Sequence, residues 1–291
     1  MPKQDPRYAF VTPYHKEGRA CLERCVASVK RQTVRADHIL VADGFPQDWL
    51  DHAGVRHLRL DRAHGDYGNT PRGVGSLMAA AEGYDGIGLL DADCWLEPDH
   101  LEHCLARAEA VGLEGCGFVV TSRTLRRPDE SVIHVADEPP SAHVDTNCLF
   151  LLPPSFEVLP VWTLMPRELS SICDRVFLVA LRARNLVSAA SAKKTVNFTY
   201  TYAPLYQHLR ETPPTPIKEN PDYRAMAAWL DALPPQRREM VNRRLGVDLR
   251  LVYGPAPVRK TQTGADSPEF SPDDAKPPSP TPTGLDEHPS S

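Results

Sequence analysis

The chain has 291 residues, of which 41% are hydrophobic and 24% charged, and its net charge is −5 at pH 7. This length and apolar content are enough to bury one large core. The net negative charge and the lack of a strongly basic stripe argue against a nucleic-acid-binding protein.

Signals for export or membrane insertion do not stand out in the sequence. No apolar run approaches the roughly 20 residues that a membrane-spanning helix needs. The N-terminal residues, MPKQDPRYAF, lack the apolar core of a signal peptide. We therefore expect a cytoplasmic protein. The Arg-rich segment 236–250 is read as a solvated helix face, with a peripheral membrane or partner contact as its alternative.

Strands and helices alternate through the first half of the chain. Apolar runs predict buried strands at 8–14, 38–44, 55–60 and 86–93. Apolar residues at helical spacing predict helices at 18–33, 71–84 and 98–108. This order predicts an α/β fold with a mostly parallel central sheet flanked by helices, in which ligands bind at the carboxyl ends of the strands.

The second half has a different pattern. It predicts further strands at 116–125, 131–137, 143–152 and 195–202, and a long helix at 167–185. The last residues, 255–291, are rich in proline, serine and threonine. Such a segment buries too little apolar surface to offset its ordering entropy, so we predict that it is disordered.

The stretch LLDADCW places two carboxylates, Asp91 and Asp93, at the end of a predicted strand. Residues two apart along a strand point the same way, so these carboxylates should project together. Their mutual repulsion would be relieved by Mg²⁺ or Mn²⁺, which prefer oxygen ligands. Acids are also common at strand ends as turn formers and helix caps, so this motif alone is weak evidence.

The segment DYGNTPRGVGS, residues 66–76, places Arg72 beside a glycine-flanked helix start. A helix N-terminus presents free N–H groups to anions, and arginine adds a fork of donors. The segment is neither a Walker loop nor a dinucleotide-binding fingerprint. A phosphate site without a Walker lysine usually needs a metal, and Asp93 is the available ligand.

The combined motifs resemble those of family 2 glycosyltransferases, which have the GT-A fold. AFVTPYHKE (9–17) is similar to the first strand of that family, LVADGF (40–45) to its second, and LLDADCWLEPDHL (89–101) to its Asp-x-Asp segment. CDRVFLVALRARNL (173–186) is similar to its later helix. The resemblance spans roughly residues 8–210. It implies a domain over 1–254, with a nucleotide-sugar half to about 125 and an acceptor half at 126–254, followed by the tail.

The resemblance also implies a role for each matching residue. The donor site would contain the following residues: Thr12, Pro13, Tyr14, Asp43, Arg72, Asp91 and Ala92. Asp93 would ligate Mg²⁺ or Mn²⁺, with His208 as a further candidate ligand that is equally well read as a surface histidine. Asp174 would be the general base for an inverting transfer to an acceptor hydroxyl.

The expected donor is a nucleotide-sugar, with a UDP-sugar as the first choice. The acceptor is open among a saccharide, a lipid carrier and a small molecule. The chain departs from the family pattern at Gly73, Cys94 and Cys173, which replace the usual Asn, Asp and Glu.

Two other readings compete with sugar transfer. A nucleotidyltransferase on a related scaffold would need a glycine-rich loop after the first strand, which TPYHKEGR (12–19) lacks. A catalytically inactive binding or scaffold protein would not need the acids at positions 43, 91, 93 and 174.

Overall fold

The computed structural model describes residues 5–135, 144–218, 220 and 222–253. The predicted disordered tail, 255–291, lies outside the described residues. The division at residue 125 stays a prediction.

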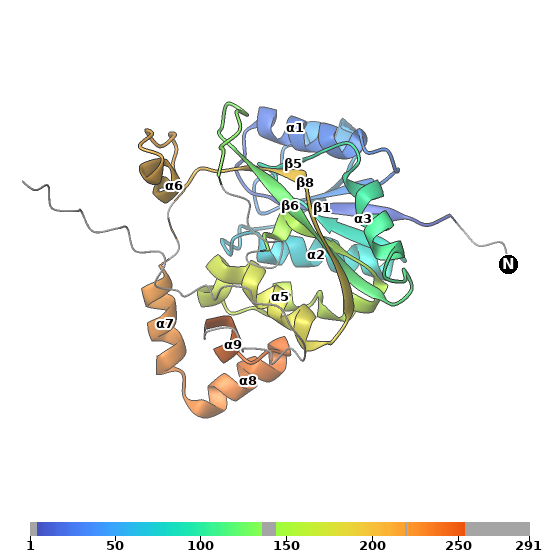
Figure 1. The fold of residues 1–291 in the computed structure, drawn as a ribbon. Coiled ribbons are helices and arrows are strands. Elements are labelled where there is room, and N and C mark those ends of the chain that lie inside the picture. Colours follow the sequence, from blue (N-terminus) through green and yellow to red (C-terminus); the bar gives the residue numbers. More distant parts are fainter. Residues whose placement is uncertain (1–4, 136–143, 219, 221, 254–291) are drawn as a thin grey trace, which may run out of the picture.

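One mixed eight-stranded sheet, in the order β3-β2-β1-β4-β7-β6-β8-β5, organises these residues (Figure 1). Its strands are β1 (Tyr8–Tyr14), β2 (Asp37–Ala42), β3 (Arg56–Arg59), β4 (Gly86–Leu89), β5 (Trp95–Leu96), β6 (Cys116–Arg126), β7 (Leu149–Leu151) and β8 (Val187–Thr199). β3, β2, β1 and β4 run parallel, while β7 pairs antiparallel with both β4 and β6. The predicted α/β sheet flanked by helices is therefore confirmed, with antiparallel pairing on one side.

Helices connect and cover the strands (Figure 1). The α-helices are α1 (Arg19–Lys30), α2 (Asn69–Ala81), α3 (His100–Glu109), α4 (Val161–Leu164), α5 (Cys173–Ala183), α6 (Ala203–His208), α7 (Tyr223–Ala232), α8 (Pro235–Leu245) and α9 (Arg250–Tyr253). Short 3₁₀ helices lie at η1 (Asp48–His52), η2 (Thr146–Cys148), η3 (Pro153–Val158) and η4 (Arg167–Ile172). No helix in the part of the chain that the structure describes is long and apolar enough to cross a bilayer.

Alternate side chains of β1 pack against two helical layers. Phe10 contacts the His100 ring of α3, with ring centroids 5.8 Å apart. Val11 faces the opposite layer, where Gly75 brings α2 so close that an added Cβ would lie 2.6 Å from the valine. Because β1 is covered on both sides, it reads in the sequence as a continuous apolar run.

Several expected elements differ from the structure. The strand predicted for 143–152 contains the 3₁₀ turn η2, and of its described residues only β7 forms a strand. β4 ends at Leu89, and a turn closed by the Cys94 N–H on the Asp91 carbonyl follows, 3.0 Å between N and O. Residues 131–135 form an isolated bridge at Val132 rather than a strand, because the chain reverses at 127–131; the rest of the predicted strand 131–137 lies outside the described residues. The helix predicted for 167–185 begins as the 3₁₀ turn η4 and becomes α-helical only at Cys173.

Candidate active site

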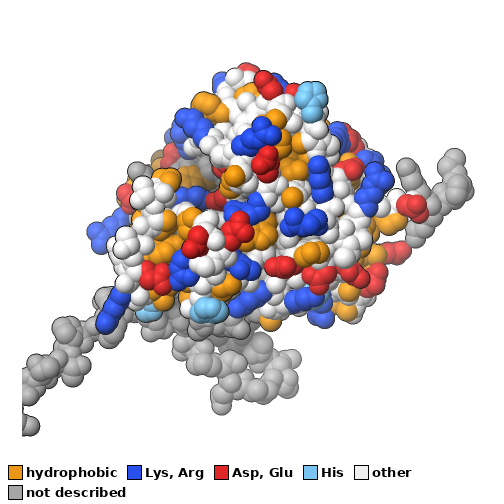
Figure 2. Space-filling model, turned by 90° about the horizontal axis from the view of Figure 1, so that it is seen from above, with side chains coloured by type: hydrophobic (Ala, Val, Ile, Leu, Met, Phe, Trp, Pro, Cys, Tyr) orange, Lys and Arg blue, Asp and Glu red, His pale blue; other side chains and the backbone are white. Residues whose placement is uncertain are grey.

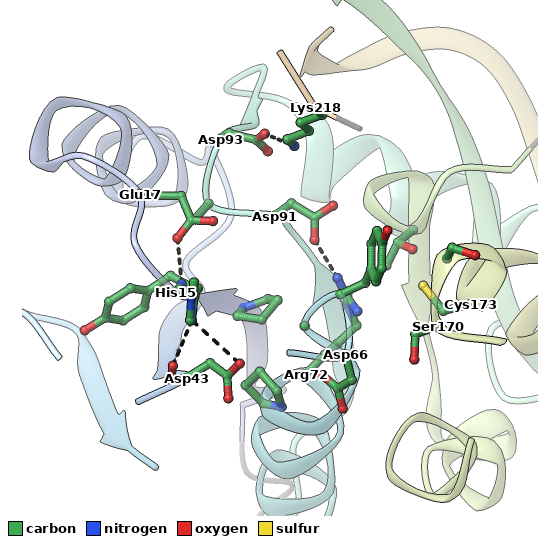
Figure 3. A pocket seen from close by; sticks show the side chains of 18 of the residues that line it. His15, Glu17, Asp43, Asp66, Arg72, Asp91, Asp93, Ser170, Cys173 and Lys218 are labelled. Atoms are coloured by element: carbon green, nitrogen blue, oxygen red, sulfur yellow. Dashed lines mark hydrogen bonds and ion pairs between the residues drawn. The ribbon is translucent and has the colours of Figure 1, made fainter. Parts of the chain in front are cut away.

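A cavity of about 430 Å³ lies where β1, β2 and β4 end. Figure 3 shows side chains that line it. Pro13 and Tyr14 end β1, Asp43 follows β2, and Asp91 to Asp93 follow β4. Because neighbouring parallel strands end at one edge of the sheet, residues far apart in the sequence meet there.

Arg72 reaches the cavity from the beginning of α2. The residue before this helix, Gly68, has φ +78°, and an added Cβ would lie 3.2 Å from Pro13. Glycine therefore allows the helix to start directly beside the end of β1. Asp66, two residues before Gly68, supports the helix start, because its carboxylate accepts hydrogen bonds from the Thr70 N–H at 3.0 Å and the Thr70 hydroxyl at 2.6 Å.

Asp91 is held by two buried side chains. Arg72 donates to its Oδ1 at 2.6 Å, and the Asn147 amide donates to its Oδ2 at 3.0 Å. Burial lowers the pKa of Arg72, but the negative charge of Asp91, its hydrogen bond to Arg72 and the other nearby acidic groups together outweigh this, and the pKa is raised overall. The guanidinium is therefore a fixed positive charge in the cavity wall.

Asp93 is paired with a lysine that lies 125 residues later in the chain. Lys218 Nζ lies 2.6 Å from Asp93 Oδ2, and Figure 3 marks this pair with a dashed line. Burial lowers the pKa of Lys218, but the Asp93 carboxylate outweighs this effect and raises it. The Asp93 carbonyl accepts hydrogen bonds from Arg24 and Thr199, so the turn that carries both acids is attached to α1 and β8.

Asp43 lies on the opposite wall, with its side chain almost fully buried. Its carboxylate accepts from the His64 N–H at 2.9 Å and shares a 2.8 Å hydrogen bond with His64 Nδ1. His15 Nδ1 lies 3.0 Å from the Asp43 carbonyl oxygen. These contacts fix the loop that follows β2 against the end of β1.

The last part of the wall comes from the second half of the chain. Asp145 lines the cavity, forms an ion pair with Arg123, and accepts from the Asn147 amide at 2.6 Å. Asn147 thus bridges Asp91 and Asp145. Cys173, at the start of α5, also lines the cavity, and burial raises its pKa to about 12.

Residues 9–139 match the family model described as glycosyl transferase family 2. The protein is a glycosyltransferase. The predicted resemblance to family 2 is therefore confirmed over the segment that holds Asp43, Arg72, Asp91 and Asp93. No curated protein sequence matches the chain significantly.

Solved structures similar to this glycosyltransferase include those of S. aureus TarS. TarS 1-349 in complex with UDP has a TM-score of 0.52 and 12% identity, covering 84% of this chain and 71% of that one. TarS 1-349 in complex with UDP-GlcNAc has a TM-score of 0.53 and 13% identity, covering 85% of this chain and 73% of that one. A longer TarS structure is covered to only 44% of its length, at 12% identity and a TM-score of 0.51. At these identities the likeness shows the fold, and the GT-A-like architecture is confirmed.

Most of the predicted site residues meet at the cavity of this glycosyltransferase. Those that line it are Pro13, Tyr14, Asp43, Arg72, Asp91, Ala92 and Asp93. Three others, all within the described chain, lie outside the lining. Thr12 is buried and shares a 2.8 Å hydrogen bond with His38. Asp174 is half-buried next to Cys173, and His208 is exposed at the end of α6. Their predicted roles stay predictions.

Sequence reasoning missed several polar residues of the site. His15 and Glu17 directly follow β1, a position that marks the ligand edge of a parallel sheet and could have indicated them. Asp145 and Asn147 precede β7, which runs antiparallel to β4, so the beginning of β7 lies near the end of β4. Lys218 lies between α6 and α7, where the sequence carries no pattern that marks it.

The donor chemistry of the cavity fits a small divalent cation. Asp91 and Asp93 provide carboxylate oxygens, the ligands that Mg²⁺ and Mn²⁺ prefer, and the Lys218 ammonium already occupies a cation's position against Asp93. Among the described residues no group of three or more His, Cys, Asp or Glu side chains could hold a metal ion by itself. Mg²⁺ is usually held by one or two carboxylates and completed by substrate phosphates, so two acids are enough.

Proposed function

We propose that this glycosyltransferase moves a sugar from a UDP-sugar to an acceptor hydroxyl in one displacement that inverts the anomeric carbon. The observation that carries the proposal is the meeting of Asp43, Arg72, Asp91 and Asp93 at one cavity. The fold it shares with TarS, whose structures hold UDP and UDP-GlcNAc, supports the choice of donor.

The nucleotide would bind along the ends of β1 and β2. Pro13 and Tyr14 form one wall there, and the buried Asp43 carboxylate offers an acceptor for a base or ribose N–H or O–H group. Thr12 would act indirectly, because its hydroxyl is bonded to His38 beneath the cavity. Asp91, fixed by Arg72 and Asn147, would orient the ribose or a water at the diphosphate.

The diphosphate would lie between Arg72 and Asp93. Arg72 supplies a positive charge that is fixed in a buried position and needs no reorganisation when the leaving group becomes more negative. A bound Mg²⁺ or Mn²⁺ at Asp93 would supply the remaining charge neutralisation on the departing nucleoside diphosphate. His208 would join the cation only after α6 has moved, since its side chain is exposed outside the cavity.

The acceptor would enter beside α5. Asp174 is proposed as the base that removes the proton from the attacking hydroxyl, and its neighbour Cys173 already lines the cavity. A single attack from the face opposite the leaving diphosphate inverts the anomeric centre. The opposite result, a product with the donor's anomeric configuration in an NMR spectrum, would exclude this mechanism.

Calorimetry tests the donor site directly. With Mn²⁺ present, UDP should bind the wild type and bind Asp93→Ala at least tenfold more weakly. Asp99→Ala is the matched control, because Asp99 is an acid paired with Lys193 outside the cavity lining. UDP affinities that are equal in wild type and Asp93→Ala would refute the assigned donor site. Tight binding of a nucleoside triphosphate with release of pyrophosphate would favour the nucleotidyltransferase alternative.

A further inference from the structure

Lys218 reaches the donor site from the wall opposite the sheet edge. Its backbone N–H bonds the Thr201 carbonyl at 3.0 Å, and the residue forms a parallel bridge with Tyr202. The base of the side chain is therefore fixed while its ammonium extends to Asp93 Oδ2, 2.6 Å away. Figure 3 shows this pair at the edge of the cavity, apart from the Arg72–Asp91 pair.

The two ion pairs differ in how firmly they are held. The side chain of Arg72 is 3% exposed and that of Lys218 is 47% exposed. Arg72 is also confined by Trp162, whose ring centroid lies 4.8 Å from the guanidinium. Lysine carries its charge on a long rotatable stem and can change partners, whereas the buried arginine cannot.

The charge balance of the cavity creates a need for such a movable cation. Carboxylates outnumber Lys and Arg among the lining residues, so a diphosphate entering the cavity meets net negative charge. While Lys218 is paired with Asp93, the carboxylate neutralises the charge of its ammonium group. If Asp93 were neutralised by another cation, the ammonium would be free to pair with a phosphate oxygen a short distance away.

We propose that Lys218 is a donor-site residue with two partners: it holds Asp93 in the nucleotide-free protein, and it releases Asp93 to a divalent cation in order to contact the diphosphate. The inference rests on the proposed function, since it assumes a nucleoside diphosphate in this cavity. Lys218 would then weaken the binding of the cation to Asp93 and strengthen the binding of the nucleotide. A single substitution should therefore shift the two affinities in opposite directions.

Two calorimetric titrations test this on the full chain: Mn²⁺ alone, and UDP at saturating Mn²⁺. Lys218→Met removes the charge while keeping the length of the side chain. We expect Mn²⁺ to bind this variant about threefold to tenfold more tightly than wild type, because no ammonium competes for Asp93. UDP should bind it about tenfold more weakly. Thermal unfolding verifies that the variant is folded.

Two further variants provide the controls. Lys218→Arg keeps the charge and should leave Mn²⁺ affinity near that of wild type. Lys193→Met removes a lysine that is paired with Asp99 outside the cavity lining, and should change neither affinity.

Mn²⁺ binding to Lys218→Met that is absent, unchanged or weaker than in wild type overturns the inference, and so does an unchanged UDP affinity. Failure of the wild type to bind UDP at all would refute the proposed donor as well. A wild type that binds UDP, combined with a silent Lys218→Met, refutes only the role of Lys218.

Discussion

Replacing Asn147 by alanine should weaken the fold and the donor site together. This side chain is fully buried and bridges two carboxylates: its amide donates to Asp91 Oδ2 at 3.0 Å and to Asp145 Oδ1 at 2.6 Å. Its Oδ1 also accepts the Asp91 backbone N–H. Alanine removes all three interactions and offers nothing in exchange.

The expected cost can be worked out from these contacts. A hydrogen bond to a charged group contributes about 1.5–3 kcal/mol, and a buried N–H left without a partner costs about 1–3 kcal/mol. Since Asp91 and Asp145 keep Arg72 and Arg123 as partners, neither carboxylate is left unpaired, and this limits the loss of stability. We expect Asn147→Ala to lower the free energy of unfolding by roughly 3–5 kcal/mol, a large share of the 5–15 kcal/mol typical of a protein.

Urea unfolding at pH 7 measures the loss, and UDP titration with Mn²⁺ measures the effect on Asp91. A second variant, Asn147→Asp, keeps the shape but adds a negative charge between Asp91 and Asp145. Its deficit relative to wild type should shrink as the pH falls and the added carboxyl takes up a proton. An Asn147→Ala protein within 0.5 kcal/mol of wild type, with unchanged UDP affinity, would refute the bridging role.

Three further predictions concern packing, acid stability and thiol reactivity. Gly73→Ala should destabilise the protein by about 1–3 kcal/mol in urea, because the new Cβ would lie 2.5 Å from Thr163 Cγ2, whereas Gly18→Ala meets nothing within 4 Å and should change little. Burial lowers the pKa of both His38 and His100 from 6.5 to about 3. Their contribution to stability is therefore complete above pH 6.5 and is lost as the pH falls toward 3. The urea midpoint should drop between pH 7 and pH 5, and His100→Asn should make this drop smaller. Burial raises the pKa of Cys173 to about 12, so its thiolate is scarce at pH 8. Mass spectrometry should show slow alkylation by iodoacetamide, and fast labelling at this residue would contradict the raised pKa.

The sequence predicts the sheet and its acidic edge because those features are local. Apolar runs mark β1 and β2, and strand-end acids mark Asp43 and Asp91. Asp93 lines the same cavity, but not because residues two apart along a strand point the same way. β4 ends at Leu89, and the turn after it, which is hydrogen-bonded to Thr199, positions both carboxylates. Residues brought in by tertiary pairing carry no such local sign.

The roles of Asn147 and Lys218 could not be predicted from local sequence patterns. Asn147 meets an acid 56 residues earlier, and Lys218 meets one 125 residues earlier. Neither pairing has a periodicity that a single sequence could reveal. β8 begins at Val187, well before the predicted 195, because pairing with β6 extends the strand through small residues of weak strand preference.

The antiparallel pairing of β7 with β4 has a consequence for how the chain may be divided. An excised fragment of residues 9–139 would end before β7 and bare the rim of β4 at Ile87 and Gly88, an open template for aggregation. It would also carry Asp91 and Asp93 without Asn147, Thr199 or Lys218. The segment that matches the family model therefore lacks part of the site. If the chain is split after this segment, the two pieces should bind a nucleotide only when they are refolded together.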